Sequence, residues 1–256
     1  MGSSGNPNHR KETHTMEAVL RRDLTILPSL CDAELKLSIP DLFAQFMDVA
    51  TLHAEELGVG AQPMIARGLG WITVKTKVHI LRRPRLMETV TFSTRPLVPE
   101  RVRAIREYRL EQNGALLAEG KTEWAVVDAA TGRPRLMEGV FDPTLELAAE
   151  PAYPAPFARI RPELSDMEAV GTYRVRSVDI DFMGHMNNIA YLRAVFGVFS
   201  AKEMKTVPQG TVEIVFRAPC FEGDRLTLRR RLTETGWELA LVREDDTPAA
   251  FLKLDR

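Results

Sequence analysis

A long apolar helix followed by a meander of strands constrains the fold of this chain more than any other feature. Ser38-Ile39-Pro40-Asp41 predicts the start of that helix, because proline is accepted in the first turn and Asp41 complements the helix dipole. The following residues are apolar over most of the helix circumference, until Gly58 and Gly60 end it. Such a helix has to be wrapped by other parts of the chain.

The residues after this helix supply the wrap. Residues 71–80 alternate between apolar and polar side chains, which predicts a strand with one wet face. Further strands are expected at 88–94, 101–111 and 116–127, the last two joined by the hairpin signal Asn113-Gly114. This pattern predicts a curved antiparallel sheet around a central helix.

The same plan occurs twice. A second strand, 171–178, precedes a helix expected from His185 to about Met204, and four more strands follow it. A proline-rich stretch without periodicity separates the two copies. We therefore predict an α+β tandem of two antiparallel sheets, each wrapped around a long central helix. The expected divisions are a disordered, tag-like tail at 1–15, an N-terminal unit at 16–141, a linker at 142–168 and a C-terminal unit at 169–256.

Composition excludes several classes of partner. The formal net charge of −1 provides no general attraction to nucleic acid or to an anionic membrane. No apolar run is long enough to span a bilayer, and no residue spacing typical of a metal site or a phosphate-binding loop occurs. Only Cys31 and Cys220 are present, and they lie far apart, so we expect a reduced, cytoplasmic location, no metal and no cofactor.

A carboxylate and a histidine lie where the second unit turns from strand into helix. The first N–H groups of a helix have no partner within it and carry partial positive charge, so a polarised carbonyl could be held there. Asp181 and His185 would lie within reach of that carbonyl, and Asn187 or Asn188 would fix the turn. The simpler interpretation is a polar turn whose side chains only cap the helix.

The segment Asp179-x-Asp181-x-x-Gly184-His185-x-Asn187-Asn188-x-x-Tyr191 resembles the hot-dog thioesterases. More closely, the chain resembles the acyl-acyl-carrier-protein (acyl-ACP) thioesterases, in which two hot-dog units follow one another. Phe43 to Gly60 is similar to their first central helix, and Trp71 and the segment Trp124 to Pro134 also fit.

This resemblance implies a double hot-dog fold that forms a pseudo-dimer within one chain, with a further homodimer left open. It implies hydrolysis of fatty acyl-ACP to free fatty acid in fatty acid biosynthesis, with acyl carrier protein as the partner. Asp181 would then be the base or nucleophile, assisted by His185 and the helix amides.

Two positions depart from the family pattern. Met183 stands where the family has asparagine, and Pro219, beside Cys220, stands where it has a glutamate. Both substitutions resemble single-domain acyl-CoA thioesterases of the hydroxybenzoyl-CoA type, in which the carboxylate matching Asp181 carries the chemistry. An acyl-CoA thioesterase, a hydratase lacking its usual serine motif and a non-catalytic acyl-binding protein therefore remain alternatives.

Several further residues are candidates for binding the acyl chain, or are plain core. Around the turn these are Met183, Gly184 and Tyr191. In the first unit the expected walls of an acyl pocket are Phe43, Phe46, Met47 and Trp71.

Overall fold

The computed structural model describes residues 19–207 and 210–256, so the tail expected at residues 1–15 lies outside the described residues. The described strands form a single twisted sheet, in which every neighbouring pair of named strands is antiparallel. Across the sheet the order is β1 (Leu20–Thr25), β3 (Thr89–Pro96), β4 (Ala104–Gln112), β5 (Ala115–Asp128), β2 (Leu69–Ile80), β8 (Thr211–Phe216), β11 (Pro248–Asp255), β10 (Gly236–Arg243), β9 (Arg225–Leu232) and β7 (Glu168–Arg174), with the short β6 (Pro134–Arg135) beside β5.

The two predicted sheets are joined edge to edge into one. Strand β2 of the first half pairs with β8 of the second, from Lys75 opposite Val215 to His79 opposite Thr211. Each half on its own would leave the backbone groups of one of these strands unpaired at a sheet edge. The prediction of two copies of a sheet wrapped around a helix is confirmed. The pairing of β2 with β8, called the seam below, adds a continuous hydrogen-bonded ladder between the two halves.

The central helix of the first half follows the prediction closely. Helix α1 (Ile39–Glu56) begins at Ser38, whose hydroxyl accepts a hydrogen bond from the backbone N–H of Asp41. It ends before Gly58, which adopts the left-handed conformation at φ +69°. A short helix that the sequence analysis missed follows it: α2 (Ala61–Ala66), with Pro63 in its first turn, where proline is tolerated.

The helix of the second half is shorter than predicted. Helix α3 runs only from Asn188 to Phe196, and a separate short helix, α4 (Ala201–Met204), follows. The break has a local cause: Ser200 accepts a hydrogen bond from the N–H of Glu203, and the Glu203 carboxylate accepts one from the N–H of Ser200. This reciprocal capping box starts a new helix after Gly197. None of the described helices is long and apolar enough to cross a membrane.

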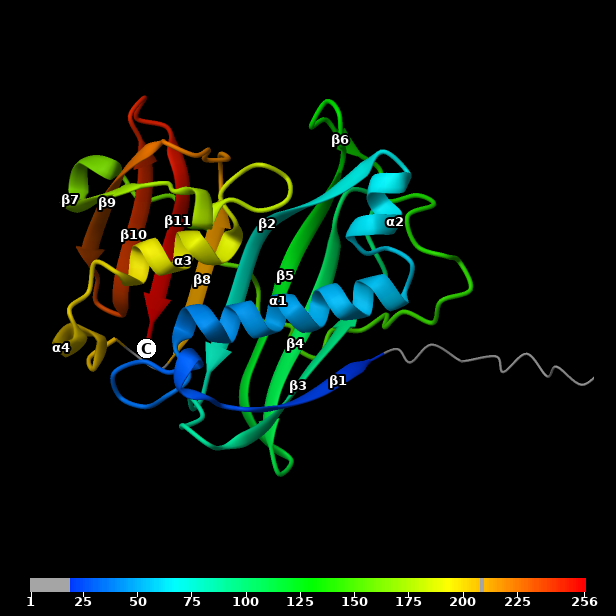
Figure 1. Cartoon of the computed structure of the whole chain (residues 1–256), viewed down its shortest axis with the longest axis horizontal. Helices are drawn as coiled ribbons and strands as arrows, with labels where there is room; N and C mark the ends of the chain where they lie inside the picture. Colours follow the sequence, from blue (N-terminus) through cyan, green and yellow to red (C-terminus); the bar gives the residue numbers. More distant parts are fainter. Residues whose placement is uncertain (1–18, 208–209) are drawn as a thin grey trace, which may run out of the picture.

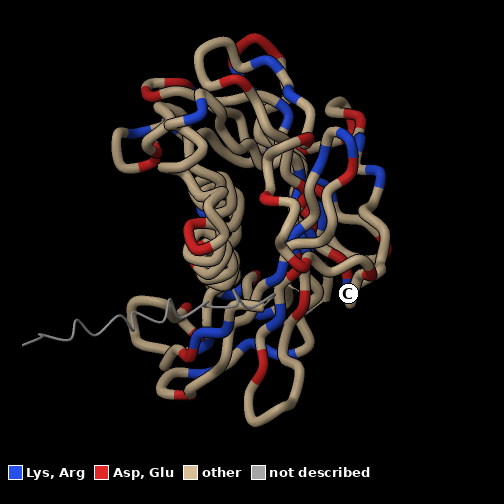
Figure 2. Tube along the Cα trace, turned by 90° about the vertical axis from the view of Figure 1, so that its right-hand side faces the viewer, with Lys and Arg blue, Asp and Glu red and all other residues tan. Residues whose placement is uncertain are grey.

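Both central helices lie on the same side of the curved sheet and contact each other (Figures 1 and 2). One apolar core runs through both halves beneath them. A smaller cluster lies beside α2, where Leu57, Met64 and Val126 pack together.

The segment between the halves crosses the opposite, charged face of the sheet. Apart from a single 3-10 turn (Leu164–Asp166), residues 149–167 have no regular structure. The ring of Phe157 covers the ammonium groups of Lys75 and Lys121, at 4.5 and 5.1 Å from its centroid. The backbone N–H of Ala158 donates to the buried carboxylate of Glu213 at 2.8 Å. The segment between the halves therefore supplies a ring contact and a hydrogen bond to charged side chains of the sheet, which would lack these partners without it.

Candidate active site

The predicted catalytic residues lie in a tight loop between a short 3-10 turn (Ser177–Asp179) and helix α3. A bridge between Ile180 and Met186 closes the base of the loop. The N–H of Asp181 donates to the carbonyl of His185 at 2.9 Å, and the N–H of Gly184 donates back to the carbonyl of Asp181 at 3.0 Å. Gly184 has φ +83°, a left-handed conformation that glycine adopts without strain. Gly184 therefore shapes the loop through its backbone.

The loop brings the two predicted catalytic side chains together. Oδ1 of Asp181 accepts a hydrogen bond from the N–H of Met183 at 2.8 Å. The same oxygen lies 3.6 Å from Nδ1 of His185. Both side chains keep solvent access, with 27% of the Asp181 and 34% of the His185 side chain exposed. The carboxylate is thus oriented by the backbone while remaining reachable by a ligand.

Asp179 has a different role from Asp181, although both lie in the same short segment. Its carboxylate is buried, and both of its oxygens lie 2.9 Å from the hydroxyl oxygen of Tyr173. One of these oxygens also accepts a 2.8 Å hydrogen bond from the N–H of Arg176. Every one of these partners lies in the strand end or in the 3-10 turn. Asp179 therefore holds the strand end.

The two asparagines act at different places. Asn187 caps α3: its Oδ1 accepts from the N–H of Ala190 at 2.9 Å, and its Nδ2 donates to the carbonyl of Asp179. Asn188 reaches the other half of the molecule, because its Nδ2 donates to Oγ1 of Thr73 in β2 at 2.7 Å. The N–H groups of Asn188 and Ile189, in the first turn of α3, have no carbonyl partner within the helix.

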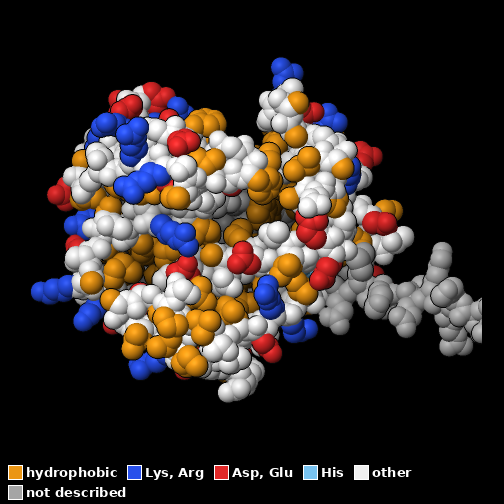
Figure 3. All heavy atoms as spheres, in the orientation of Figure 1, with side chains coloured by type: hydrophobic (Ala, Val, Ile, Leu, Met, Phe, Trp, Pro, Cys, Tyr) orange, Lys and Arg blue, Asp and Glu red, His pale blue; other side chains and the backbone are white. Residues whose placement is uncertain are grey.

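Met183 also connects the loop to the first half. Its terminal methyl group lies 3.3 Å from where a Cβ would stand on Gly70, at the start of β2. Together with the Asn188–Thr73 hydrogen bond, this places the loop on the seam between the halves. Figure 3 shows a hollow at the upper end of this seam, with hydrophobic side chains gathered around it.

Tyr191, expected to bind substrate, instead supports the loop after β8. It is buried, its hydroxyl accepts from the N–H of Cys220 at 3.1 Å, and it donates to the carbonyl of Ala218 at 3.3 Å. Burial raises the pKa of Tyr191 well above its ordinary value. The hydroxyl of Tyr191 is therefore engaged within the protein, and a role of this residue in substrate binding stays a prediction. Burial also raises the pKa of the neighbouring Cys220 thiol, which argues against Cys220 as a nucleophile.

Removing the hydroxyl of Tyr191 tests this supporting role. Tyr191→Phe leaves the buried N–H of Cys220 without a partner, so we expect the free energy of unfolding to fall by about 1–3 kcal/mol. Urea denaturation measures the change. Unchanged stability would show that the hydroxyl does not hold this loop.

The proposed walls of the acyl pocket are divided between two clusters. Phe43 and Phe46 are fully buried in the main core, and Met47 packs against it with partial exposure. Trp71 belongs to the smaller cluster, where its indole N–H donates to the carbonyl of Val59 at 2.7 Å. The four side chains therefore belong to two separate apolar clusters.

The interior of the first half contains a buried polar group that the sequence analysis missed. Arg106 is buried on the side of β4 that faces α1, although charged side chains of a strand usually face solvent. Its Nη1 lies 3.0 Å from Nδ1 of His53 and 3.4 Å from Oγ1 of Thr94, and burial lowers the pKa of the guanidinium to about 10. The signal was available: Arg106 shares the strand phase of Tyr108 and Leu110, both fully buried.

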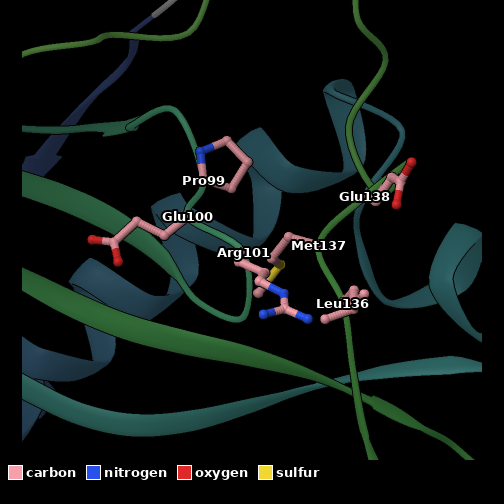
Figure 4. Close-up of a pocket in the computed structure, with 6 residues that line it drawn as sticks. All are labelled: Pro99, Glu100, Arg101, Leu136, Met137 and Glu138. Carbon is pink, nitrogen blue, oxygen red and sulfur yellow. The ribbon is translucent and has the colours of Figure 1, made fainter.

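A surface pocket of about 320 Å³ lies on the first half (Figure 4). None of the predicted site residues lines it. Its lining consists of Pro99, Glu100, Arg101, Leu136, Met137 and Glu138, with Glu100 and Glu138 pointing away from the centre.

The fold and the sequence both match known thioesterases. The chain aligns along nearly its full length with an acyl-ACP thioesterase from Bacteroides thetaiotaomicron (18% identity, TM-score 0.85, covering 93% of this chain and 97% of that one). It also aligns with a 12:0-ACP thioesterase from Umbellularia californica (15% identity, TM-score 0.79, covering 93% and 97%). Among curated proteins, no sequence matches this chain significantly.

Family models give a match that is independent of the fold. The model of the acyl-ACP thioesterase N-terminal domain matches residues 17–141, and that of the C-terminal domain matches residues 163–248. The two models follow one another in the order of the two halves and together cover most of the chain. The protein, a double hot-dog thioester hydrolase, therefore belongs to the acyl-ACP thioesterase family.

Proposed function

We propose that this enzyme hydrolyses fatty acyl-ACP to free fatty acid in the cytoplasm, as a step of fatty acid biosynthesis. The observation that carries the proposal is the Asp181 carboxylate, which is accessible, oriented by the N–H of Met183 and adjacent to His185 on the seam between the halves. Membership of the acyl-ACP thioesterase family supports the choice of thioester.

The chemistry requires a base or nucleophile at the carbonyl carbon and donors where negative charge develops on oxygen. Asp181 takes the first role, either by activating water or by attacking the carbonyl directly. The N–H groups of the first turn of α3 take the second, a contribution of about 3 kcal/mol for each donor that is well placed. His185 orients the thioester or donates a hydrogen bond to it.

Met183 has no group with which to hold a water, unlike the asparagine of the family pattern. Its terminal methyl group lies near Gly70 of β2, which supports our assignment of Met183 to the lining of the acyl channel. The channel would continue between α1 and the sheet, past Phe43, Phe46 and Met47. Trp71 would contact only the outer end of this channel, because its indole is hydrogen-bonded within the smaller cluster.

A comparison of two substrates tests this function. The purified protein is incubated with the same fatty acyl chain on acyl carrier protein and on coenzyme A, and the free thiol released is measured. Faster release from the carrier protein supports the proposal, whereas faster release from coenzyme A favours the hydroxybenzoyl-CoA type that Met183 and Pro219 suggest. Binding of both thioesters without release of thiol would favour the non-catalytic alternative.

The tether between the halves has an expected effect on turnover. Asn188→Ala removes the hydrogen bond to Thr73, so the catalytic loop is held less firmly against β2. Because small misplacements of reacting groups are costly, we expect kcat to fall by about tenfold or more. Thr73→Val removes the same bond from the other side and should give a similar loss. If both variants keep the full kcat, the tether has no part in positioning the site.

A further inference from the structure

Three large apolar side chains lie exposed beside the catalytic loop. Val178 is 82% exposed, Phe182 is 76% exposed and Phe221 is 47% exposed. The N–H of Met186 donates to the carbonyl of Cys220 at 2.8 Å, which fixes the chain around Phe221 against the base of the loop. Grouped apolar side chains with polar surroundings are typical of surfaces that bind another macromolecule.

Four arginines accompany these apolar side chains. Arg174 at the end of β7 lies directly opposite Arg225 at the start of β9, so both side chains occupy the same face of the sheet. Arg176 follows two residues after Arg174, and Arg217 begins the loop that leads to Phe221. All four are exposed. Like charges directly opposite each other weaken a strand pair, so this arrangement does not stabilise the sheet.

These arginines differ from the other arginines of the same half. Arg230 pairs with Glu203, Arg231 pairs with Glu238, and Arg243 lies near Asp245. Within the described parts of the chain, none of the four arginines beside the loop forms an ion pair. Figure 3 shows basic side chains, together with some acidic ones, over the upper part of the second half. Glu222, Asp224 and the turn at 244–246 lie at the same end of the sheet, but among the described residues none of their carboxylates forms an ion pair with these four arginines.

We propose that Arg174, Arg176, Arg217 and Arg225, with Val178, Phe182 and Phe221, form the docking surface for a carrier protein whose binding face is acidic around an apolar centre. This inference rests on the proposed function, because that carrier delivers the acyl thioester to Asp181. Coenzyme A could pair its phosphates with the arginines but would leave the apolar side chains in water. A protein face covers both, which is why the surface favours the carrier protein.

Charge reversal separates docking from chemistry. In the double variant Arg174→Glu with Arg225→Glu, we expect kcat/KM for acyl-ACP to fall by about tenfold or more, mainly through a higher KM. Hydrolysis of the same acyl chain on N-acetylcysteamine, which has no protein to dock, should remain at the wild-type rate. Raising the salt concentration should lower kcat/KM for acyl-ACP in the wild type more than in the variant.

A matched control lies at the other edge of the sheet. Arg21 and Arg22 on β1 are also exposed and form no ion pair with another described residue, so Arg21→Glu with Arg22→Glu changes the charge equally. This control should hydrolyse acyl-ACP as the wild type does. Phe221→Ser, which leaves charge unchanged, should again raise the KM for acyl-ACP alone.

The outcomes distinguish the two proposals. If the wild type hydrolyses both thioesters but the loop-side charge reversal and Phe221→Ser leave acyl-ACP kinetics unchanged, the docking surface is wrong and the enzymatic function stands. Equal loss on both substrates, or equal loss in the Arg21 and Arg22 control, also overturns it. If the wild type releases no thiol from any acyl thioester, the proposed function is wrong, and so is the docking surface that rests on it.

Discussion

Asp181→Asn is expected to reduce hydrolysis of a fatty acyl thioester by about a thousandfold or more, the upper part of the range for loss of a general base. The amide oxygen can still accept the hydrogen bond from the N–H of Met183, so the loop keeps its shape. The amide cannot take a proton from water or attack a carbonyl, so the chemical step is lost. Single-turnover release of free thiol measures this step without interference from product release.

The matched control is Asp245→Asn, the same change in the exposed turn between β10 and β11. It should leave turnover unaltered. Thermal unfolding of both variants should match the wild type closely, which separates chemistry from stability. Turnover retained in Asp181→Asn would remove this carboxylate from the mechanism, whatever the fold.

Phe46→Ala should produce the largest loss of stability among simple core truncations. The Phe46 ring stacks on Tyr108 with centroids 5.0 Å apart and meets Phe92 edge-on at 5.5 Å, and it is almost fully buried beneath α1. Truncating a buried phenylalanine costs about 3–5 kcal/mol, because it removes both the apolar contact and the volume that filled the site. Chemical denaturation should show this loss in the unfolding free energy.

Phe182→Ala is the control with identical chemistry, since that ring is mostly exposed on the catalytic loop. A change of about 0.5 kcal/mol or less is expected there. If Phe46→Ala were equally mild, the core of the first half would have to be loose enough to close around the missing ring.

The parts of the fold that could be predicted from the sequence are those with a local cause. The first central helix is marked by the cap at Ser38 and by the left-handed Gly58, both of which act within a few residues. The hairpin at Asn113-Gly114 is equally local, and both residues do adopt positive φ. The alternation of each strand follows from burial of one face.

Other parts of the fold depend on contacts between residues far apart in the chain, which cannot be predicted from the pattern of one segment. Pairing of β2 with β8 depends on edges more than 130 residues apart, such as His79 and Thr211. The inward direction of Arg106 requires His53 from a distant helix as a neighbour. The early end of α3 was a different failure, because the Ser200–Glu203 capping box is readable in the sequence and the apolar period obscured it.

The candidate site shows the same division. The proximity of Asp181 and His185 was predictable, because both lie in one short loop. The contact of Asn188 with Thr73 joins residues 115 positions apart and needed the three-dimensional arrangement. The position of Tyr191 in the motif does not reveal that its hydroxyl is hydrogen-bonded to Ala218 and Cys220.

The seam between β2 and β8 has a consequence for any attempt to divide this enzyme. A fragment that ends after the first half would expose the N–H and C=O groups of β2 along residues 75–79, where β8 now covers them. Bare strands of this kind recruit other strands, so such a fragment should self-associate or precipitate when it is expressed alone. Co-expression of the complementary fragment would restore solubility, since only β8 pairs with the exposed N–H and C=O groups of β2 in the correct register.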